Sequence, residues 1–312
     1  MVENKCEDRK ACDNCEISSN CSTVEKKEHE RKRLQDKLFH IKRKVMVMSG
    51  KGGVGKSTVA TNLAASLALR GYQVGIIDAD LHGPDVPRML GIEGQRLISS
   101  GNGVEPVEVF PGFKAVSMAL LGQEPDKAIV WRGPLKHSAI KQFLGGMNWG
   151  DLDFLFVDLP PGTGDEPLSV SQLMEEVDGT VIVTTPQDVA LLDSRKAVNF
   201  SKQINIPVLG IVENMSGMAC PHCGEKIDLF KIGGGEKAAK ELGVPFLGRI
   251  PIDPDVVLSC DAGEPFVSEP NPSVAKTAFA QVVQNLLEGL AWSEKEVGSQ
   301  HSQATVVTDG VK

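Results

Sequence analysis

The stretch Gly50-Lys51-Gly52-Gly53-Val54-Gly55-Lys56-Ser57-Thr58 decides the fold. An apolar run at 45–48 precedes it, and apolar residues at helical spacing follow it over 58–70. A glycine loop with the spacing G-x-x-x-x-G-K-[ST] between a strand and a helix is typical of a phosphate-binding loop. Its inward backbone N–H groups and the helix N-terminus attract anions. We therefore expect these nine residues to bind a nucleotide.

Three side chains of this loop have the chemistry to act on ATP. Lys56 is placed to reach the β- and γ-phosphates, and the Ser57 hydroxyl is placed to ligate Mg²⁺. An ordinary phosphate-binding loop does not need the second lysine, Lys51. The run K-G-G-V-G-K-S resembles the deviant Walker A motif of the MinD, ParA and nitrogenase iron-protein class, in which this lysine reaches the partner's nucleotide. By that resemblance, Lys51 supplies the charge that an arginine finger supplies elsewhere.

Two aspartates at strand ends complete the expected ATPase site. The strand at 74–78 leads into Asp80, which is placed to orient the attacking water. The strand at 154–158 ends in Asp158, the Walker B position, which holds Mg²⁺ mainly through water. Further strands at 180–185, 208–212 and 244–250 alternate with helices, so we predict an α/β, doubly wound, mostly parallel sheet. Residues 92–125 suggest an irregular hairpin excursion.

Other polar residues follow the later strands. Asn214 comes after the 208–212 strand and offers an amide that can read the adenine edge, although asparagine also ends strands for turn reasons. Pro251 and Asp253 follow the 244–250 strand and are further candidates for binding the nucleotide.

Cys220 and Cys223 supply two thiolates, which is half of a four-ligand site. Three completions are open. A second subunit can supply a matching pair across a two-fold axis, Cys12 and Cys15 can fold back to make a zinc site, or the pair can be a redox dithiol. Cys260 stands alone and is interpreted as a buried small residue.

The first 21 residues contain Cys6, Cys12, Cys15 and Cys21 among almost no apolar side chains. Such a segment cannot fold by burial, but a metal could order it. Four thiolates suit a 4Fe-4S cluster or a tetrahedral zinc ion, and a disordered thiol-bearing tail is the alternative.

The predicted organisation has four parts. Residues 1–21 form the cysteine segment, 22–44 a charged linker helix, 45–290 the ATPase domain and 291–312 a disordered tail. Ser22 and Glu25 can form a capping box, and Leu34, Leu38 and Ile41 share one helical face.

Composition limits the possible partners. The net charge is −8 over 312 residues. Residues 1–44 contribute +3, so the remainder carries −11, which argues against nonspecific binding of nucleic acid. No apolar run approaches the roughly 20 residues of a membrane span. Seven cysteines beside a nucleotide motif indicate metal chemistry in the cytoplasm rather than disulfides.

The chain resembles the Mrp/ApbC-type iron–sulfur cluster carrier ATPases, in the branch with an N-terminal cysteine motif. Similarity runs from about residue 45 to 267 and rests on motifs that occur in the family's order. These motifs are 50–58, 78–90, 131–134, 157–165, 213–216, 220–224 and 248–254. In the tail, Cys12, Cys15 and Cys21 fit the family's C-x2-C-x5-C, whereas Cys6 lies closer to Cys12 than that pattern expects.

The resemblance implies a role for each candidate. Asp80 is the hydrolytic aspartate, Asp158 serves Mg²⁺, and Asn214 contacts adenine. Cys220 and Cys223 hold a 4Fe-4S cluster shared by two subunits, and the tail cysteines hold a second cluster.

We therefore expect a homodimeric ATPase that delivers iron–sulfur clusters to apoproteins. A positioning ATPase of MinD or ParA type would need a membrane helix or a DNA-binding surface, and the sequence shows neither. A zinc-stabilised regulatory ATPase that transfers nothing shares every motif and stays open.

Overall fold

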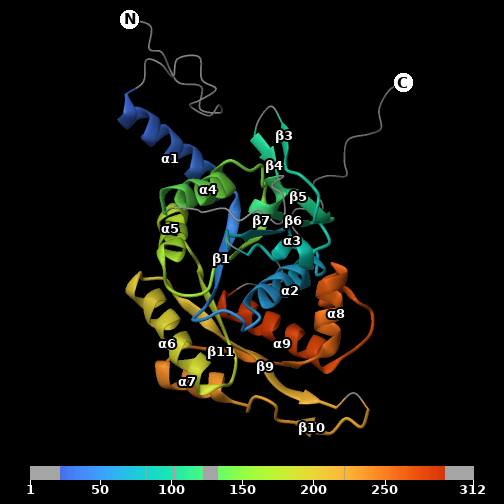
Figure 1. The fold of residues 1–312 in the computed structure, drawn as a ribbon. Coiled ribbons are helices and arrows are strands. Elements are labelled where there is room, and N and C mark those ends of the chain that lie inside the picture. The colour runs from blue at the N-terminus through green and yellow to red at the C-terminus, as the bar shows by residue number, and fades with distance from the viewer. Residues whose placement is uncertain (1–21, 82, 101–102, 122–132, 221, 292–312) are drawn as a thin grey trace, which may run out of the picture.

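The computed structural model describes residues 22–291 apart from 82, 101–102, 122–132 and 221 (Figure 1). The predictions for the cysteine segment 1–21 and for the tail beyond residue 291 lie outside this part of the chain. Within it, no helix is both long and apolar enough to span a bilayer.

A sheet of nine described strands forms the centre of the molecule, in the order β10-β9-β8-β1-β7-β2-β6-β5, with β11 also paired to β9. Pairing is parallel except between β5 and β6 and between β9 and β10. The strands are β1 (Ile41–Ser49), β2 (Val74–Asp78), β5 (Val107–Phe110), β6 (Phe113–Ser117), β7 (Leu152–Asp158), β8 (Gly179–Thr184), β9 (Val208–Ala219), β10 (Lys226–Ile227) and β11 (Phe246–Ile252). The hairpin β3 (Ile98–Ser100) and β4 (Gly103–Glu105) lies apart from this sheet. The doubly wound, mostly parallel α/β architecture is confirmed.

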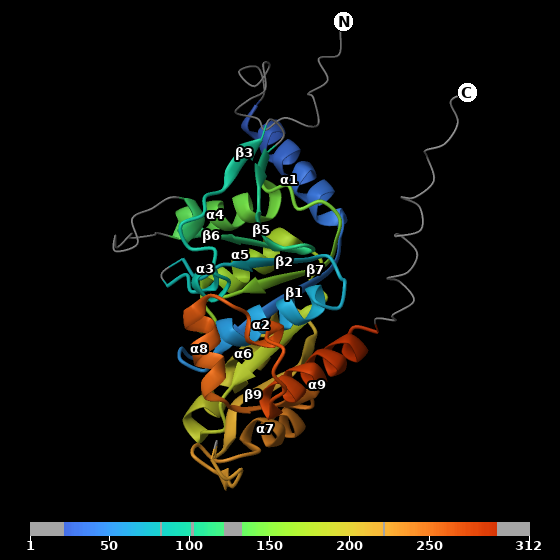
Figure 2. The ribbon, with the colours of Figure 1, turned by 90° about the vertical axis from the view of Figure 1, so that its right-hand side faces the viewer.

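Helices cover both faces of the sheet (Figures 1 and 2). They are α1 (Thr23–Phe39), α2 (Lys56–Ala68), α3 (Val86–Met89), α4 (Gly133–Gly145), α5 (Asp165–Met174), α6 (Asp188–Gln203), α7 (Gly234–Leu242), α8 (Pro254–Ala262) and α9 (Val274–Gly289), with single 3₁₀ turns η3 (Met118–Leu121) and η4 (Phe266–Ser268). Successive residues of β1 point to opposite faces. Val45 and Val47 join the core under α2 and α9, whereas Met46 and Met48 join the core under α1, α4 and α6. The two cores therefore sandwich one sheet.

Residues 92–125 contain more regular structure than the expected hairpin excursion. The β3–β4 hairpin is there, but β6 is a parallel neighbour of β2 in the main sheet. Lys114 interrupts the apolar pattern of this strand and directs its ammonium to the carbonyl of Trp149, at 2.8 Å. This interruption hides the strand in the sequence.

The first helix ends earlier than the predicted linker helix 22–44. Helix α1 stops at Phe39, and Ile41 begins β1 instead of continuing the helical face. The charged residues of β1 are ion-paired, with Lys42 2.9 Å from Asp153 and Arg43 2.8 Å from Asp178. Paired charges of this kind let the strand start four residues before the apolar run. The Ser22–Glu25 capping box is present as predicted.

Helix α1 packs against the domain. Leu34 and Leu38 are 5% and 4% exposed and belong to the core beneath α4 and α5. Arg31 forms an ion pair with Glu175 at 3.0 Å, and Lys37 donates to the Asn148 side chain at 2.9 Å. The helix is thus a fixed part of the ATPase body.

We predict that Leu38→Ala lowers the free energy of unfolding by about 2–4 kcal/mol, because it removes a buried side chain and leaves a cavity. Val24→Ala on the same helix is the control, because Val24 is 72% exposed and should change stability by less than about 0.5 kcal/mol. Denaturant unfolding followed by circular dichroism measures both. Equal effects of the two substitutions would show that α1 is a free linker.

Candidate nucleotide and cysteine sites

The phosphate-binding loop joins the end of β1 to the start of α2, as the motif predicts. Gly53 and Gly55 both have φ of 78°, a left-handed conformation that favours glycine. Gly50 packs so closely against α6 that a Cβ there would overlap the backbone of Asp193. Two of the glycines therefore set the loop's path, and a third lets it rest on α6.

Lys56 lies at the bottom of this loop, with its side chain 7% exposed. Its ammonium is 2.6 Å from Asp158 Oδ1 and donates to Ser57 Oγ at 3.2 Å. The structure thus brings together the expected phosphate lysine, the Walker B aspartate and the magnesium serine.

Two buried carboxylates share this single ammonium. Asp78 and Asp158 lie opposite each other in the register of β2 and β7. Burial raises the pKa of Asp78 well above its ordinary value, and the Asp158 carboxylate adds to this rise. Burial also raises the pKa of Asp158, although the Lys56 ammonium opposes the shift. The sequence placed Asp78 only at a strand end and missed this role.

A magnesium ion fits the donors at this position. Asp158 Oδ2 is buried and has no hydrogen-bond partner among the residues that the structure describes. The Ser57 hydroxyl lies near the same carboxylate, because both accept a hydrogen bond from the Lys56 ammonium. Oxygen ligands of this kind suit Mg²⁺, directly or through water.

Asp80 lies half-exposed at the carboxyl end of β2, beside the two buried aspartates. Its backbone N–H donates to Asp78 Oδ1 at 3.1 Å, and its carboxylate accepts from the Gly83 N–H at 3.3 Å. Lys51 is half-buried, and its ammonium forms no hydrogen bond or ion pair with the described residues. Asp80 thus follows the end of β2, and Lys51 lies within the glycine loop.

Asn214 contacts the phosphate loop itself. Its side-chain nitrogen donates to the carbonyl of Val54 at 2.9 Å, and the residue is 8% exposed. A Cβ on Gly55 would overlap this nitrogen, so the glycine also makes room for the asparagine. The structure therefore ties β9 to the nucleotide loop, a contact that the sequence does not reveal.

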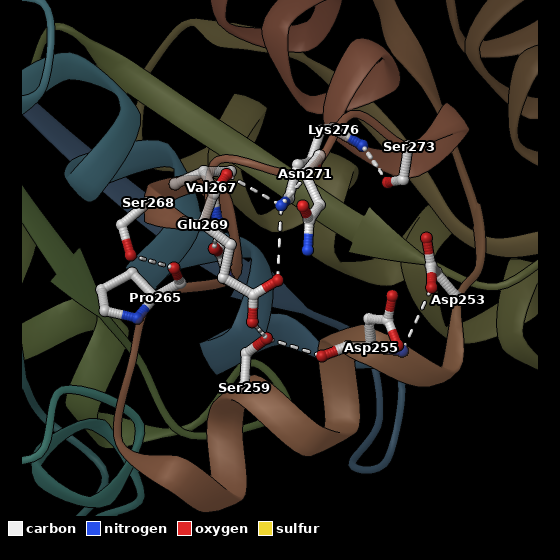
Figure 3. A network of polar contacts seen from close by, with 11 residues as sticks. Asp253, Asp255, Ser259, Pro265, Val267, Ser268, Glu269, Asn271, Ser273 and Lys276 are labelled. Carbon is white, nitrogen blue, oxygen red and sulfur yellow. Dashed lines mark hydrogen bonds and ion pairs between the residues drawn. The ribbon is translucent and has the colours of Figure 1, made fainter.

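Pro251 and Asp253 are half-buried near the start of α8. Asp253 caps this helix by accepting from the Asp255 N–H at 3.1 Å (Figure 3). Figure 3 also shows Glu269 linking Ser259 of α8 to Lys276 of α9. This network fixes the segment that follows β11, and the Val267 N–H joins it to Asn62 of α2 at 3.1 Å.

Cys220 and Cys223 lie in the turn between β9 and β10, which we call the cysteine hairpin. The turn is closed by hydrogen bonds from Cys220 N–H to the Glu225 carbonyl and from Gly224 N–H to the Cys220 carbonyl, both 2.8 Å. Backbone N–H groups of Cys223 and His222 lower the pKa of the Cys220 thiol. A lowered pKa favours the thiolate, which is the form of cysteine that binds metals.

The hairpin holds two thiols per chain. Cys223 is exposed and Cys220 half-buried. No group of three or more potential metal ligands gathers anywhere in the described part of the chain. Cys260 lies elsewhere, on α8, where burial raises the pKa of its thiol and Thr58 is its hydrogen-bond partner. It is half-buried rather than fully buried as the sequence suggested.

A comparison with known protein families identifies the family to which the chain belongs. Residues 40–287 match the ParA family profile described as NUBPL iron-transfer P-loop NTPase. The chain belongs to this family. The match confirms the family expected from the motifs, and with it a nucleoside-triphosphate-hydrolysing fold.

Two curated relatives of the chain have the same name. An iron-sulfur cluster carrier protein of Methanococcus maripaludis is 48% identical over 89% of this chain and 96% of its own length. One from Pyrococcus abyssi is 49% identical over 83% of this chain and 90% of its own.

Solved structures agree in fold. A nucleotide-binding protein of Archaeoglobus fulgidus in complex with ADP is 39% identical, with a TM-score of 0.68 over 79% of this chain and 98% of its own. The cell division ATPase MinD of Pyrococcus furiosus has a TM-score of 0.57 at 22% identity, over 79% of this chain and 99% of its own, which shows the shared fold.

Two glycine substitutions separate the roles of the loop. We predict that Gly55→Ala abolishes nucleotide binding, because the new methyl group both strains the backbone and overlaps Asn214. Gly53→Ala has the same φ but would contact nothing within 4 Å, so it should cost only about 1 kcal/mol of backbone strain and retain binding. Titration with a fluorescent ADP analogue compares them. Equal losses would show that the Asn214 contact is unimportant.

Proposed function

We propose that the protein is an ATP-dependent carrier of iron–sulfur clusters, which binds a cluster between two subunits and transfers it to apoproteins. One observation carries this proposal. The strand that contacts the phosphate loop through Asn214 continues directly into the hairpin that bears Cys220 and Cys223. Membership of an iron-transfer family and the names of the relatives support the same function.

The nucleotide half of the proposal assigns ATP to the glycine loop. Lys56 binds the β- and γ-phosphates and exchanges its present contact with Asp158 for them. Ser57 and Asp158 hold Mg²⁺, which neutralises charge that develops on the phosphates. We assign Asn214, Pro251 and Asp253 to the nucleoside side of the site.

Hydrolysis in this proposal needs two chains. Asp80 orients the attacking water in its own subunit, and Lys51 extends into the partner's site. Lys51 is half-buried and its ammonium forms no hydrogen bond or ion pair within the described part of its own chain, which supports a role across an interface. Closure of the dimer on ATP would then alter the cluster held at the same interface.

The cluster half requires four thiolates, because each iron of a 4Fe-4S cluster takes one. A two-fold axis brings two hairpins together and supplies them. A metal site that Cys12 and Cys15 complete within the same chain is disfavoured, because the chain before α1 is too short to bring them to the cysteine hairpin. Ser22 begins α1 at one end of the molecule, and the cysteine hairpin lies at the other end (Figures 1 and 2).

The lengths of α1, β1 and the preceding segment allow this separation to be estimated. Helix α1 has 17 residues and β1 has nine, so they span roughly 25 Å and 30 Å between Ser22 and the nucleotide loop. Seven residues from Ser22 back to Cys15 reach at most about 25 Å. This reach supports the shared site over a zinc site within one chain.

The tail cysteines Cys6, Cys12, Cys15 and Cys21 are proposed to hold a second 4Fe-4S cluster. Reduced thiols in this number suit the cytoplasm, where we place the protein. A zinc-stabilised regulatory ATPase is the competing function, and the family's iron-transfer description favours the carrier.

The interface roles can be tested with mixed dimers. Lys51→Ala and Asp80→Ala should each hydrolyse ATP slowly. An equimolar mixture after subunit exchange should regain about a quarter of the wild-type rate, because half the dimers are mixed and each has one intact site. A mixture of Lys56→Ala with Asp80→Ala is the control and should stay inactive, since both residues act in the same chain. No recovery in the first mixture would place Lys51 in its own chain's site.

The shared cluster can be tested in the full-length chain with all four tail cysteines changed to serine. Anaerobic reconstitution should then give a brown protein with about two iron atoms per chain, that is, one cluster per dimer. This cluster should pass to an apo-acceptor. Cys223→Ala should lose both properties, whereas Cys260→Ala, outside the hairpin, should retain them. A colourless product that contains zinc or no metal would refute the carrier function.

A further inference from the structure

Among the residues that the structure describes, Glu213 is the most completely buried carboxylate outside the nucleotide site, with its side chain 0% exposed. It lies in the 213–216 motif, but neither the sequence analysis nor the proposed chemistry gives it a role. An ionised carboxylate that loses water must be compensated by hydrogen bonds or opposite charge. The contacts that compensate Glu213 indicate what it does.

Those contacts come from both ends of the excursion that carries the cysteine hairpin. On the outgoing strand, the Ser216 hydroxyl donates to Glu213 Oε1. On the return, the Gly233 N–H donates to Oε1 at 2.8 Å and the Gly235 N–H donates to Oε2. A Cβ on Gly235 would lie 3.0 Å from this carboxylate, so the glycine permits the approach.

Two neighbouring features connect Glu213 to the rest of the domain. Arg249 of β11 lies 3.6 Å from Oε1 and also pairs with Glu236 of α7. The next residue along β9 is Asn214, which donates to Val54 of the phosphate loop. One dipeptide therefore contacts both the nucleotide loop and the base of the cysteine hairpin.

The strand between these two sites is irregular. Ile250 and Ile252 of β11 pair with Asn214 and Met218 of β9, so three residues of β9 lie opposite Pro251 alone. This bulge holds Met215 at φ 55°, a left-handed conformation that is uncommon outside glycine. Bulges and strained residues of this kind concentrate where a strand must redirect or switch.

We propose that Glu213 is a positioning residue that couples the nucleotide loop to the cysteine hairpin. Displacement of the phosphate loop on binding nucleotide moves Asn214. Glu213 transmits the movement because its carboxylate ties the outgoing strand to the returning chain at Gly233 and Gly235. The bulge at Met215 absorbs the change in backbone angles. This inference rests on the proposed function only in taking the hairpin to be the cluster site.

The coupling can be measured on the metal-free, full-length chain. Pulses of iodoacetamide with and without magnesium and a non-hydrolysable ATP analogue report the reactivity of the hairpin thiols. Mass spectrometry of the peptide containing Cys220 and Cys223 separates them from the other cysteines. In the wild type, the nucleotide should change the alkylation rate about fivefold or more, the range of ordinary coupling between sites.

Glu213→Gln is the informative variant, because its NH₂ group must face a backbone N–H that the carboxylate had accepted. It should still bind the analogue, but the nucleotide should change its alkylation rate by less than about twofold. Glu236→Gln is the matched control, since it removes the other partner of Arg249 at an exposed position and should respond as the wild type does. A purely structural role would alter melting temperature without abolishing this ratio.

Two results would overturn the proposal: a wild type whose hairpin thiols ignore the nucleotide, or a folded Glu213→Gln protein that responds fully. If Glu213→Gln does not fold, Ser216→Ala removes one donor to the same carboxylate. A Ser216→Ala response reduced below the wild-type ratio supports coupling, and an unchanged ratio refutes it. Because the thiols are read without metal, the outcome is independent of cluster binding, whose failure would be seen in the reconstitution experiment.

Discussion

The structure depends on an imbalance of charge at the carboxyl edge of the sheet, where Asp78 and Asp158 are buried beside one lysine. Parallel pairing of β2 with β7 forces the two carboxylates into register, and β1 delivers the glycine loop next to them. A buried charge without compensation is costly, so this edge is built for further cations and for a phosphate group that draws Lys56 away. In the proposed function, a magnesium nucleotide supplies these charges.

Close backbone approach then determines what surrounds that edge. Gly50 lets the loop rest on α6, and Gly55 lets Asn214 reach the Val54 carbonyl. Because Asn214 belongs to β9, the loop that follows β1 is bonded to a strand two positions away in the sheet order, beyond β8. That same strand extends beyond its pairing with β8, which ends at Glu213, and leads into the cysteine hairpin. One continuous strand, β9, therefore connects the phosphate loop to the thiols of the cysteine hairpin.

The sequence predicted the features that depend on local pattern. The glycine loop, the strand ending at Asp158 and the capped start of α1 follow from spacing and composition, and the structure contains each of them. It did not predict features that depend on distant partners. The strand β6 is hidden by Lys114, whose carbonyl partner lies 35 residues away. In the sequence, Glu213 cannot be told from other polar residues near strand ends, because the Gly233 and Gly235 N–H groups that bind its carboxylate lie about 20 residues further along the chain.

The packing of α1 against the domain limits how far the N-terminal cysteines can reach, and no sequence motif indicates this. A flexible linker would let the N-terminal thiols visit the hairpin, but Leu34 and Leu38 bury the helix in the core beneath α4 and α5. Their burial fixes where residue 22 leaves the body, at the end opposite the hairpin. The chain toward the N-terminal cysteines therefore starts from a point far from the cysteine hairpin. With at most about 25 Å of chain between Ser22 and Cys15, this fixed start disfavours a metal site that Cys15 shares with the hairpin of its own chain, and in the proposed function it is the hairpin that responds to the nucleotide.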